Sequence, residues 1–378
     1  MSGRPRVLVV GRSRYRLPLP DWLAKKWDAI EETLDYRVLG ASDHGGALMN
    51  ERFRLRPRAR PRLLDGVLFY LRLPFWIRRQ LAEFRPDVVV AADPYVGAAA
   101  LVGRRLAGTR PPLIVEVHGD WRTFSRLYGS PFRRLLSRLT DRVAGWTLRH
   151  ADATRALSAF TSGLVEEARG LPATASFATY SDRSAFTAHP VAPLPSRPTA
   201  LFVGALEAYK NVEGLRAAWR HVTEELPEAL LVIVGDGSRR AVVDRLAREL
   251  PGRVEHYPRL APDEVARKLD EATLLVLPSW PEGLGRVVIE AFARGRAVVA
   301  TAAGGILDLV TDGVEGILVP RGDTVALTDA LVRMLGDREL AERAGRAAHA
   351  RYADWHATPD DFARDLRELV DRVLAGAR

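Results

Sequence analysis

The sequence of 378 residues predicts an α/β protein of two domains, each an open parallel sheet with helices on both faces. Short apolar runs that end at a glycine, a proline or a polar residue alternate with longer amphipathic stretches along most of the chain. This alternation is typical of parallel strands joined by crossover helices. A proline-rich segment, residues 187–198, interrupts it once and has the composition of a stiff linker. The length also suits two domains of roughly 150–200 residues each.

In the first domain, residues 1–186, the apolar runs predict strands separated by helices. The first run, residues 7–10, ends at Gly11 and is too short for a signal peptide. The strands are expected at residues 7–10, 36–39, 87–92, 112–118 and 152–158. The helices are expected at residues 22–34, 95–106 and 131–150.

The second domain, residues 199–357, repeats the same rhythm, and residues 358–378 have the pattern of an amphipathic helix. Its strands are expected at residues 200–203, 230–234, 254–257, 274–278, 297–300 and 316–319. Ligands of open parallel sheets bind beyond the carboxyl ends of the strands. With two such domains, we expect the binding site in a deep cleft between them.

The composition excludes several classes of protein. The chain has no cysteine, so disulfides, thiolate nucleophiles and cysteine-bound metals are absent, which is compatible with the cytoplasm. No apolar run reaches the ~18–20 residues that span a bilayer. Nearly half of the residues are hydrophobic, which argues against wholesale disorder.

The formal net charge of +9 is concentrated in an arginine-rich stretch, residues 52–79, where aromatic and aliphatic residues lie between the arginines. This mixture is typical of a segment that docks on an anionic membrane surface. A solvated loop that leads into an ordinary core helix explains the same residues. Nucleic-acid binding is the weakest of the three interpretations, and we expect no nucleic-acid partner.

The most informative segment carries two glutamates, Glu282 and Glu290, around a pair of glycines. It follows an expected buried strand, so Glu282 should lie in a loop, with Gly283 and Gly285 allowing a tight turn into a helix. The start of a helix offers free N–H groups and a positive dipole end, which suit a phosphate. Carboxylates on both sides suit the hydroxyls of a polyol. A nucleotide sugar has both parts, whereas the weaker interpretation of Glu290 is an i,i+4 ion pair with Arg294.

A lysine stands out in the second domain because the chain contains only four lysines. Lys210 follows the strand that ends at Gly204 and comes just before the next helix. An ammonium group there can bind a phosphate, whereas a plain surface lysine would face the unfavourable end of the helix dipole. Gly235-Asp236-Gly237 closes the following strand, and turn geometry explains it as well as ligand contact does.

The ordered set of these motifs resembles the nucleotide-sugar half of retaining glycosyltransferases of family 4, which have the GT-B architecture of two Rossmann-like domains. The resemblance rests on Gly204 with Lys210-Asn211, on Gly235-Asp236-Gly237, on Glu282 and Glu290-Ala291, and on residues 295–301. It covers residues 200–334 well and is thinner across the first domain. It also implies that the last helix crosses back to the first domain.

The resemblance implies a role for each matching residue. Glu282 would hold hydroxyls of the donor sugar, and His118, which follows a buried strand, would reach the transferred sugar; the alternative is a histidine satisfied by neighbouring backbone. Glu290 would bind the ribose, and Leu260 would contact the base through its backbone. The diphosphate would be bound by the backbone amides of residues 284–287 and by Lys210, and Gly11 would let the acceptor-side loop approach it. The donor would thus be bound by the following further residues: Gly11, Gly204, Lys210, Gly283, Leu284, Gly285, Arg286 and Val287.

The chain departs from the family pattern at three places. Ala205 stands where an arginine is common, and Lys210 or one of Arg12, Arg14 and Arg286 is expected to compensate. Residues 179–182 replace a usual Asn-Gly, and the loop after Gly11 is unusually basic.

The resemblance implies a retaining, metal-independent transfer of a sugar from a UDP- or GDP-sugar to a hydroxyl acceptor, with attack from the front face and no cofactor. The arginine-rich stretch favours a lipid-linked or cell-envelope acceptor and a cytoplasmic protein peripheral to the plasma membrane. The alternatives are an epimerase, which would consume its donor without an acceptor, and a phosphorylase, which would hold pyridoxal phosphate on a lysine. A non-catalytic basic protein that binds membrane or nucleic acid is the alternative of another class.

Overall fold

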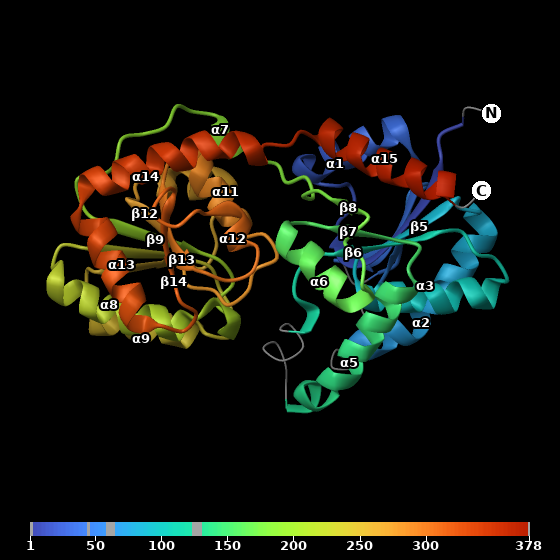
Figure 1. The fold of residues 1–378 in the computed structure, drawn as a ribbon, viewed down its shortest axis with the longest axis horizontal. Helices are drawn as coiled ribbons and strands as arrows, with labels where there is room; N and C mark the ends of the chain where they lie inside the picture. The colour runs from blue at the N-terminus through green and yellow to red at the C-terminus, as the bar shows by residue number, and fades with distance from the viewer. Residues whose placement is uncertain (1–2, 44–45, 58–64, 123–130, 377–378) are drawn as a thin grey trace. The chain divides into compact units, whose positions relative to one another are not determined.

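The computed structural model describes residues 3–376 except residues 44–45, 58–64 and 123–130. The chain forms two compact units, each with its own sheet and core (Figure 1). The N-terminal unit contains the described residues up to Asp182 and the end of the chain from Ala357. The C-terminal unit is Arg183–His356. Each unit is an α/β sandwich of the kind that the alternating pattern predicts.

The sheet of the N-terminal unit has the strand order β3-β4-β2-β1-β5-β6-β7-β8 in the described residues, and all neighbours except the β3–β4 pair are parallel. Its central strands are almost completely buried because helices cover both faces. The strands are β1 (Arg6–Tyr15), β2 (Asp35–Ser42), β3 (Leu48–Met49), β4 (Phe53–Arg56), β5 (Val88–Ala91), β6 (Leu113–Val117), β7 (Ala153–Ala156) and β8 (Ala175–Ser176).

Two layers of helices cover this sheet. Side chains of α2 (Asp65–Phe84), α3 (Pro94–Ala107), α5 (Pro131–His150) and α6 (Ala159–Arg169) pack with one set of strand residues. Those of α1 (Asp21–Thr33) and α15 (Pro359–Gly376) pack with the other. The chain's last helix therefore belongs to the N-terminal unit, where Arg367 Nη1 donates a hydrogen bond of 2.7 Å to Thr33 O in α1.

The sheet of the C-terminal unit is parallel throughout its described strands, in the order β11-β10-β9-β12-β13-β14. Its strands are β9 (Thr199–Val203), β10 (Leu230–Val234), β11 (Val254–Tyr257), β12 (Leu274–Leu277), β13 (Ala297–Thr301) and β14 (Gly316–Val319). Its helices are α7 (Ser184–Thr187), α8 (Val212–Glu225), α9 (Arg240–Glu249), α10 (Pro262–Asp270), α11 (Arg286–Ala293), α12 (Ile306–Leu309), α13 (Thr324–Gly336) and α14 (Arg338–Arg351), with 3₁₀ turns at Ala208–Lys210 and Tyr352–Trp355.

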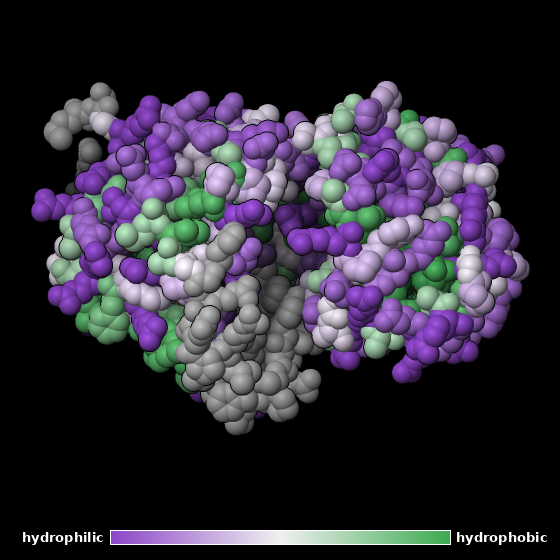
Figure 2. All heavy atoms as spheres, turned by 180° about the vertical axis from the view of Figure 1, so that it is seen from behind, coloured by the Kyte–Doolittle hydropathy of each residue, from purple (hydrophilic) through white to green (hydrophobic). Residues whose placement is uncertain are grey.

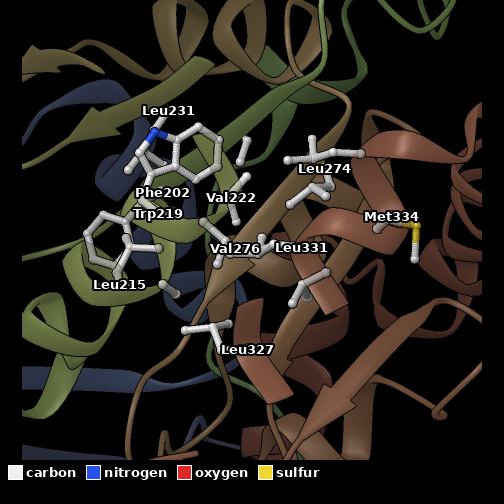
Figure 3. Packing of buried hydrophobic residues seen from close by; sticks show 14 of the residues in the cluster. Phe202, Leu215, Trp219, Val222, Leu231, Leu274, Val276, Leu327, Leu331 and Met334 are labelled. Carbon is white, nitrogen blue, oxygen red and sulfur yellow. The ribbon is translucent and has the colours of Figure 1, made fainter. Parts of the chain in front are cut away.

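The main core of the C-terminal unit lies between α8, α13 and the sheet (Figure 3). Trp219 of α8 and Phe202 of β9 are completely buried in it, and Leu331 of α13 packs in the same cluster. Burial of such a side chain contributes about 1.5–3 kcal/mol each. This core anchors the strands whose loops carry the candidate site.

The sequence pattern predicted the six strands of the C-terminal unit to within about one residue at each end. In the N-terminal unit β1 is longer than expected, because the chain continues as strand beyond Gly11 to Tyr15 after a break in its register with β2. The short strands β3, β4 and β8 were not predicted. Each has four residues or fewer, which leaves little periodicity to detect.

The arginine-rich stretch, residues 52–79, divides into parts with different surroundings. In β4 Phe53 and Leu55 are buried, and Arg52 forms an ion pair with Glu31. Arg56 stacks over the ring of Trp76 at 5.1 Å. The expectation that this first part is a loop is therefore wrong for residues 53–56, which form a strand in the sheet. Arg58, Arg60 and Arg62 lie outside the described residues.

The proline-rich segment, residues 187–198, runs over the C-terminal unit and is fastened to it by arginines. Arg294 donates to the carbonyl oxygens of His189 and Pro190, both at 2.7 Å, and Arg296 donates to that of Ala192 at 2.9 Å. Arg294 also pairs with Asp270 at 2.8 Å. Its guanidinium is thus bound to this segment and to Asp270, so the interpretation of Glu290 as the i,i+4 partner of Arg294 is wrong.

Candidate functional site

Four loops meet at the carboxyl edge of the sheet in the C-terminal unit, and backbone hydrogen bonds tie them together. Leu206 N, after β9, donates to Asp236 O, after β10, at 3.0 Å. Trp280 N, after β12, donates to Tyr209 O at 2.7 Å. Gly305 N, after β13, donates to Glu282 O at 2.8 Å. The loops therefore form one rigid platform rather than four independent turns.

The close approach of two of these loops requires a glycine. Gly235 has a φ of 147°, and a Cβ added there would lie 1.9 Å from the carbonyl oxygen of Gly204. A side chain would push the β9 and β10 loops apart. The sequence left turn geometry and ligand contact open for this glycine, and backbone packing accounts for it.

Lys210 and Glu282 lie side by side on this platform although 72 residues separate them in the sequence. Lys210 Nζ donates to Glu282 Oε1 at 2.5 Å, and the two side chains are only 9% and 16% exposed. The lysine also lies 5.2 Å from the ring centre of Tyr209. A buried ammonium and a buried carboxylate each need a partner, and here they supply it to each other.

Glu282 is followed by the start of α11, where Gly285 makes the turn. Gly285 has a φ of 76°, and an added Cβ would lie 2.5 Å from Ile306 Cδ1. Leu284 and Val287 point inward and are buried, while Arg286 is exposed. The first N–H groups of α11 have no acceptor within the helix, so this turn offers hydrogen-bond donors at the positive end of the helix dipole.

Glu290 lies one turn further along α11, among buried neighbours, Ile289 and Ala291. Burial raises the pKa of Glu290 to about 7, although the charges of Arg286 and Arg183 act to lower it. A carboxylate held at this cost between apolar residues is typical of a functional site. Leu260, by contrast, lies after β11 in the loop that precedes α10 and is half-buried.

In the N-terminal unit His118 directly follows β6 and is bound to a charged cluster. His118 Nε2 lies 3.0 Å from Glu116 Oε2, and Arg155 Nε of β7 donates to Glu116 Oε1 at 2.8 Å. Arg155 is buried and also donates to Phe177 O and Thr179 Oγ1. The alternative of a histidine satisfied by neighbouring backbone is therefore wrong, since its partner is a carboxylate.

Charges around Glu116 decide its ionisation. Burial works to raise the pKa of Glu116, but the charges of Arg155, His118 and Lys26 hold it well below its usual range. Burial also lowers the pKa of Lys26 to about 8, although Glu116 acts to raise it. Lys26 Nζ lies 4.8 Å from the ring centre of Phe362 in α15. The cluster thus joins α1, β6, β7 and the last helix of the chain.

The basic residues that follow β1's Gly11 have different surroundings. Arg12 pairs with Asp65 at 3.1 Å, whereas Arg14 is exposed. Gly11 itself is buried, and an added Cβ would lie 3.1 Å from Ala92 Cβ. Of the three arginines expected to replace the one missing at Ala205, Arg12 is engaged with a carboxylate and Arg14 and Arg286 are exposed.

The structure thus brings together most of the predicted residues of the second domain, namely Gly204, Lys210, Glu282, Gly283, Leu284, Gly285, Arg286, Val287 and Glu290. Gly11 and His118 belong to the other unit. Sequence reasoning missed Glu116 and Arg155. A charged residue inside each of two short apolar strands was the signal that could have found them.

No group of three or more histidine or acidic side chains in the described part of the chain could hold a metal ion. No helix within those same residues is long and apolar enough to cross a membrane.

Comparison with known proteins identifies the family. Residues 6–176 match the family described as glycosyl transferase 4-like domain, and residues 188–351 match glycosyl transferases group 1. Alpha-D-kanosaminyltransferase of Streptomyces kanamyceticus is 31% identical over 321 residues, which cover 78% of this chain and 81% of that protein. Sulfoquinovosyl transferase SQD2 of Arabidopsis thaliana is 33% identical over 168 residues, 43% of this chain and 32% of that protein.

Solved structures share the fold over almost the whole chain. Sucrose-phosphate synthase from Thermosynechococcus elongatus has a TM-score of 0.78 and 19% identity, with 99% of this chain and 100% of that chain covered. Anabaena Alr3699/HepE, in complex with UDP and glucose, has a TM-score of 0.70 and 20% identity, with 97% and 99% covered. The two Rossmann-like units are therefore those of a GT-B glycosyltransferase. The chain belongs to the glycosyl transferases group 1 family, and it is an enzyme that transfers glycosyl groups.

Proposed function

We propose that the protein is a retaining glycosyltransferase that moves a sugar from a UDP- or GDP-sugar to a hydroxyl acceptor. The observation that carries the proposal is the meeting of Lys210, Glu282 and the start of α11 on one platform, with Glu290 a turn further on. This set supplies one cation, an N–H array and two carboxylates. A nucleotide sugar needs these same groups for its diphosphate and its two sets of hydroxyls.

The donor would rearrange the ion pair that Lys210 and Glu282 form. The diphosphate oxygens would accept hydrogen bonds from Lys210 Nζ and from the N–H groups of residues 284–287. Glu282, no longer fully engaged by the lysine, would accept hydrogen bonds from hydroxyls of the transferred sugar. Glu290 would accept them from the ribose, and backbone atoms near Leu260 would contact the base.

The reaction would follow from charge stabilisation on the leaving group. As the bond between the anomeric carbon and the diphosphate breaks, Lys210 and the amides would stabilise the growing negative charge without requiring a metal ion. The acceptor oxygen would bond to the anomeric carbon on the same face, and its proton would pass to the departing phosphate. We assign His118 to the transferred sugar, with Glu116 as the partner that orients its ring.

We infer a lipid-linked or cell-envelope glycan as the acceptor and a cytoplasmic, membrane-peripheral site of action. The basic, aromatic-rich sequence around α2 supports both parts of this inference. Several relatives act on other acceptors, for instance one named as an inositol 3-phosphate glycosyltransferase from Nocardia farcinica. The names of the relatives therefore do not identify the acceptor of this protein, and a direct assay has to identify it.

The test is a transfer assay with a panel of UDP- and GDP-sugars and with polyprenyl-linked and soluble glycan acceptors. We expect a product whose anomeric configuration, measured by NMR, equals that of the donor. Glu282→Ala should abolish most of the transfer, whereas Glu213→Ala, an exposed glutamate on α8, should leave it unchanged. Inversion at the anomeric carbon, or full activity of Glu282→Ala with normal donor binding, would refute the proposal. Donor consumption without any acceptor would favour an epimerase.

A further inference from the structure

The helical layer of α2, α3 and α5 in the N-terminal unit carries an outward-facing set of large apolar side chains. The inner sides of these helices pack on the sheet, so this set is not needed for the core. It contains half of the fourteen large hydrophobic side chains that are exposed in the described residues. We call it the apolar outer face; its residues are Val67, Leu71, Phe75, Val102, Leu106, Leu139 and Trp146.

Three of these side chains form a stripe on α2. Val67, Leu71 and Phe75 recur every four residues, which places them on one side of the helix. They are 57%, 64% and 61% exposed. Figure 2 shows hydrophobic residues of the N-terminal unit among hydrophilic ones in the region where α2 runs. Scattered single apolar residues are ordinary on a protein surface, but a continuous stripe beside further apolar residues marks an interaction site.

The exposed charges on the same layer are mostly positive. Its exposed basic residues are Arg72, Arg78, Arg79, Arg105, Arg110, Arg138, Arg142 and Arg149. The carboxylates in these three helices are Asp65, Glu83 and Asp141. Asp65 pairs with Arg12, and Glu83 pairs with Arg79 at 2.5 Å, so neither neutralises the rest of the arginines.

Between α3 and α5 the same layer is hollowed by a cavity of about 240 Å³. Leu101, Val102 and Trp146 line it with apolar groups, while Arg105 and Arg110 contribute guanidinium groups. An apolar hollow beside two cations is suited to an amphiphile with an acidic head group. The cavity and the α2 stripe belong to the same layer because α3 packs against both α2 and α5.

We propose that the apolar outer face docks the protein on an anionic lipid bilayer. The stripe of α2 enters the boundary between head groups and acyl chains, and the arginines of α2, α3 and α5 contact acidic head groups. The occupant is a bilayer rather than a second copy of the chain, because two copies of a face with eight exposed arginines would repel each other. The docking surface gives the proposed membrane-peripheral enzyme its partner, and it is independent of the donor site in the other unit.

The test measures binding of the full-length protein to vesicles of phosphatidylcholine with or without phosphatidylglycerol, by flotation. We expect binding only with the anionic lipid, and weaker binding at high salt. The double variant Leu71→Ser with Phe75→Ser should bind at least about tenfold more weakly. Arg72→Gln with Arg78→Gln should bind roughly tenfold more weakly at low salt. The matched controls Val325→Ser, whose side chain is 71% exposed on α13, and Arg220→Gln on α8 should bind like the wild type.

Several results would overturn the docking proposal. They are wild-type protein that does not bind anionic vesicles, double variants that bind as well as the wild type, or a dimer in solution that Leu71→Ser with Phe75→Ser dissociates. Nucleotide-sugar binding by the same variants separates the two proposals. A protein that binds donor but not vesicles refutes only the docking surface, and one that binds vesicles but no donor refutes only the proposed transfer activity.

Discussion

Glu290 gives the most detailed prediction because its ionisation is coupled both to stability and to the proposed donor. The folded protein holds its pKa at about 7, against about 4.5 in the unfolded chain. The folded state therefore binds the proton more tightly. The stability that this tighter proton binding adds is complete below pH 4.5, falls as the pH rises through 7, and is absent above pH 7. The wild type therefore has roughly 3 kcal/mol less stability at pH 8 than it would have if Glu290 stayed neutral.

Glu290→Gln removes the free-energy cost of burying the ionised carboxylate, because a neutral amide of similar shape carries no charge to desolvate. At pH 8 the variant should be more stable than the wild type by up to about 3 kcal/mol, which corresponds to a rise in Tm of several degrees. At pH 5 the difference should shrink to about 1 kcal/mol or less. Thermal unfolding between pH 5 and pH 8, with Glu213→Gln on the surface of α8 as the control, measures the difference.

Donor binding should favour the ionised form of Glu290, whereas folding favours the protonated form. Ribose hydroxyls donate to the ionised carboxylate, so binding of a nucleotide sugar should lower the pKa of Glu290 and release a proton near pH 7. Calorimetry in buffers of different ionisation enthalpy detects the proton, and Glu290→Gln should bind at least about tenfold more weakly without releasing it. If the variant is destabilised equally at pH 5 and pH 8 and binds donor normally, both the buried charge and its role are wrong.

Three further predictions follow from other contacts. Lys210→Met should lower the free energy of unfolding, measured in urea, by about 1–3 kcal/mol because it leaves Glu282 without its cation. Adding Glu282→Gln should restore stability but not donor binding. A double variant that binds donor as tightly as the wild type would contradict this. Gly285→Ala should be more destabilising than Gly313→Ala. Gly313 has a similar φ of 77°, but a Cβ added there would lie in open space, whereas one at Gly285 would meet Ile306. Equal Tm values of the two variants would show that this contact with Ile306 is unimportant. Glu116→Gln should lower the free energy of unfolding by roughly 3 kcal/mol at pH 7 because it leaves Arg155 without its carboxylate partner. This loss of stability should shrink below about pH 4.5, where the glutamate of the unfolded wild type binds its proton. A loss of stability that does not depend on pH would refute the ion pair.

The sequence predicted the C-terminal unit closely because its strands are apolar runs bounded by glycine, proline or charged residues. Residues 230–234 and 274–277 are such runs, and no competing pattern covers them. The site in this unit could be predicted for the same reason: its residues follow those strands directly. Their contacts could not, and the pairing of Lys210 with Glu282 became visible only when the loops were placed together.

The N-terminal unit was harder to predict because several of its residues depend on tertiary contacts. Phe53 and Leu55 alternate with arginines, a pattern that fits an interfacial segment as well as the strand β4 that they form between β2 and β3. Arg155 lies in a strand of four residues, where its charge is acceptable only because Glu116 on the neighbouring strand β6 pairs with it. Arg294 likewise looked like a helix-surface partner of Glu290, but its side chain reaches carbonyl groups of residues 186–190.

The central claim is that the C-terminal unit binds a nucleotide sugar between Lys210 and Glu290. The most direct measurement is a calorimetric titration of the full-length protein with UDP- and GDP-sugars at pH 8, repeated with Lys210→Met and with Arg220→Gln. We predict saturable binding of at least one donor by the wild type and by Arg220→Gln, and a loss of at least about tenfold in affinity with Lys210→Met. Binding of no nucleotide sugar, or equal affinity of all three proteins, would contradict the claim.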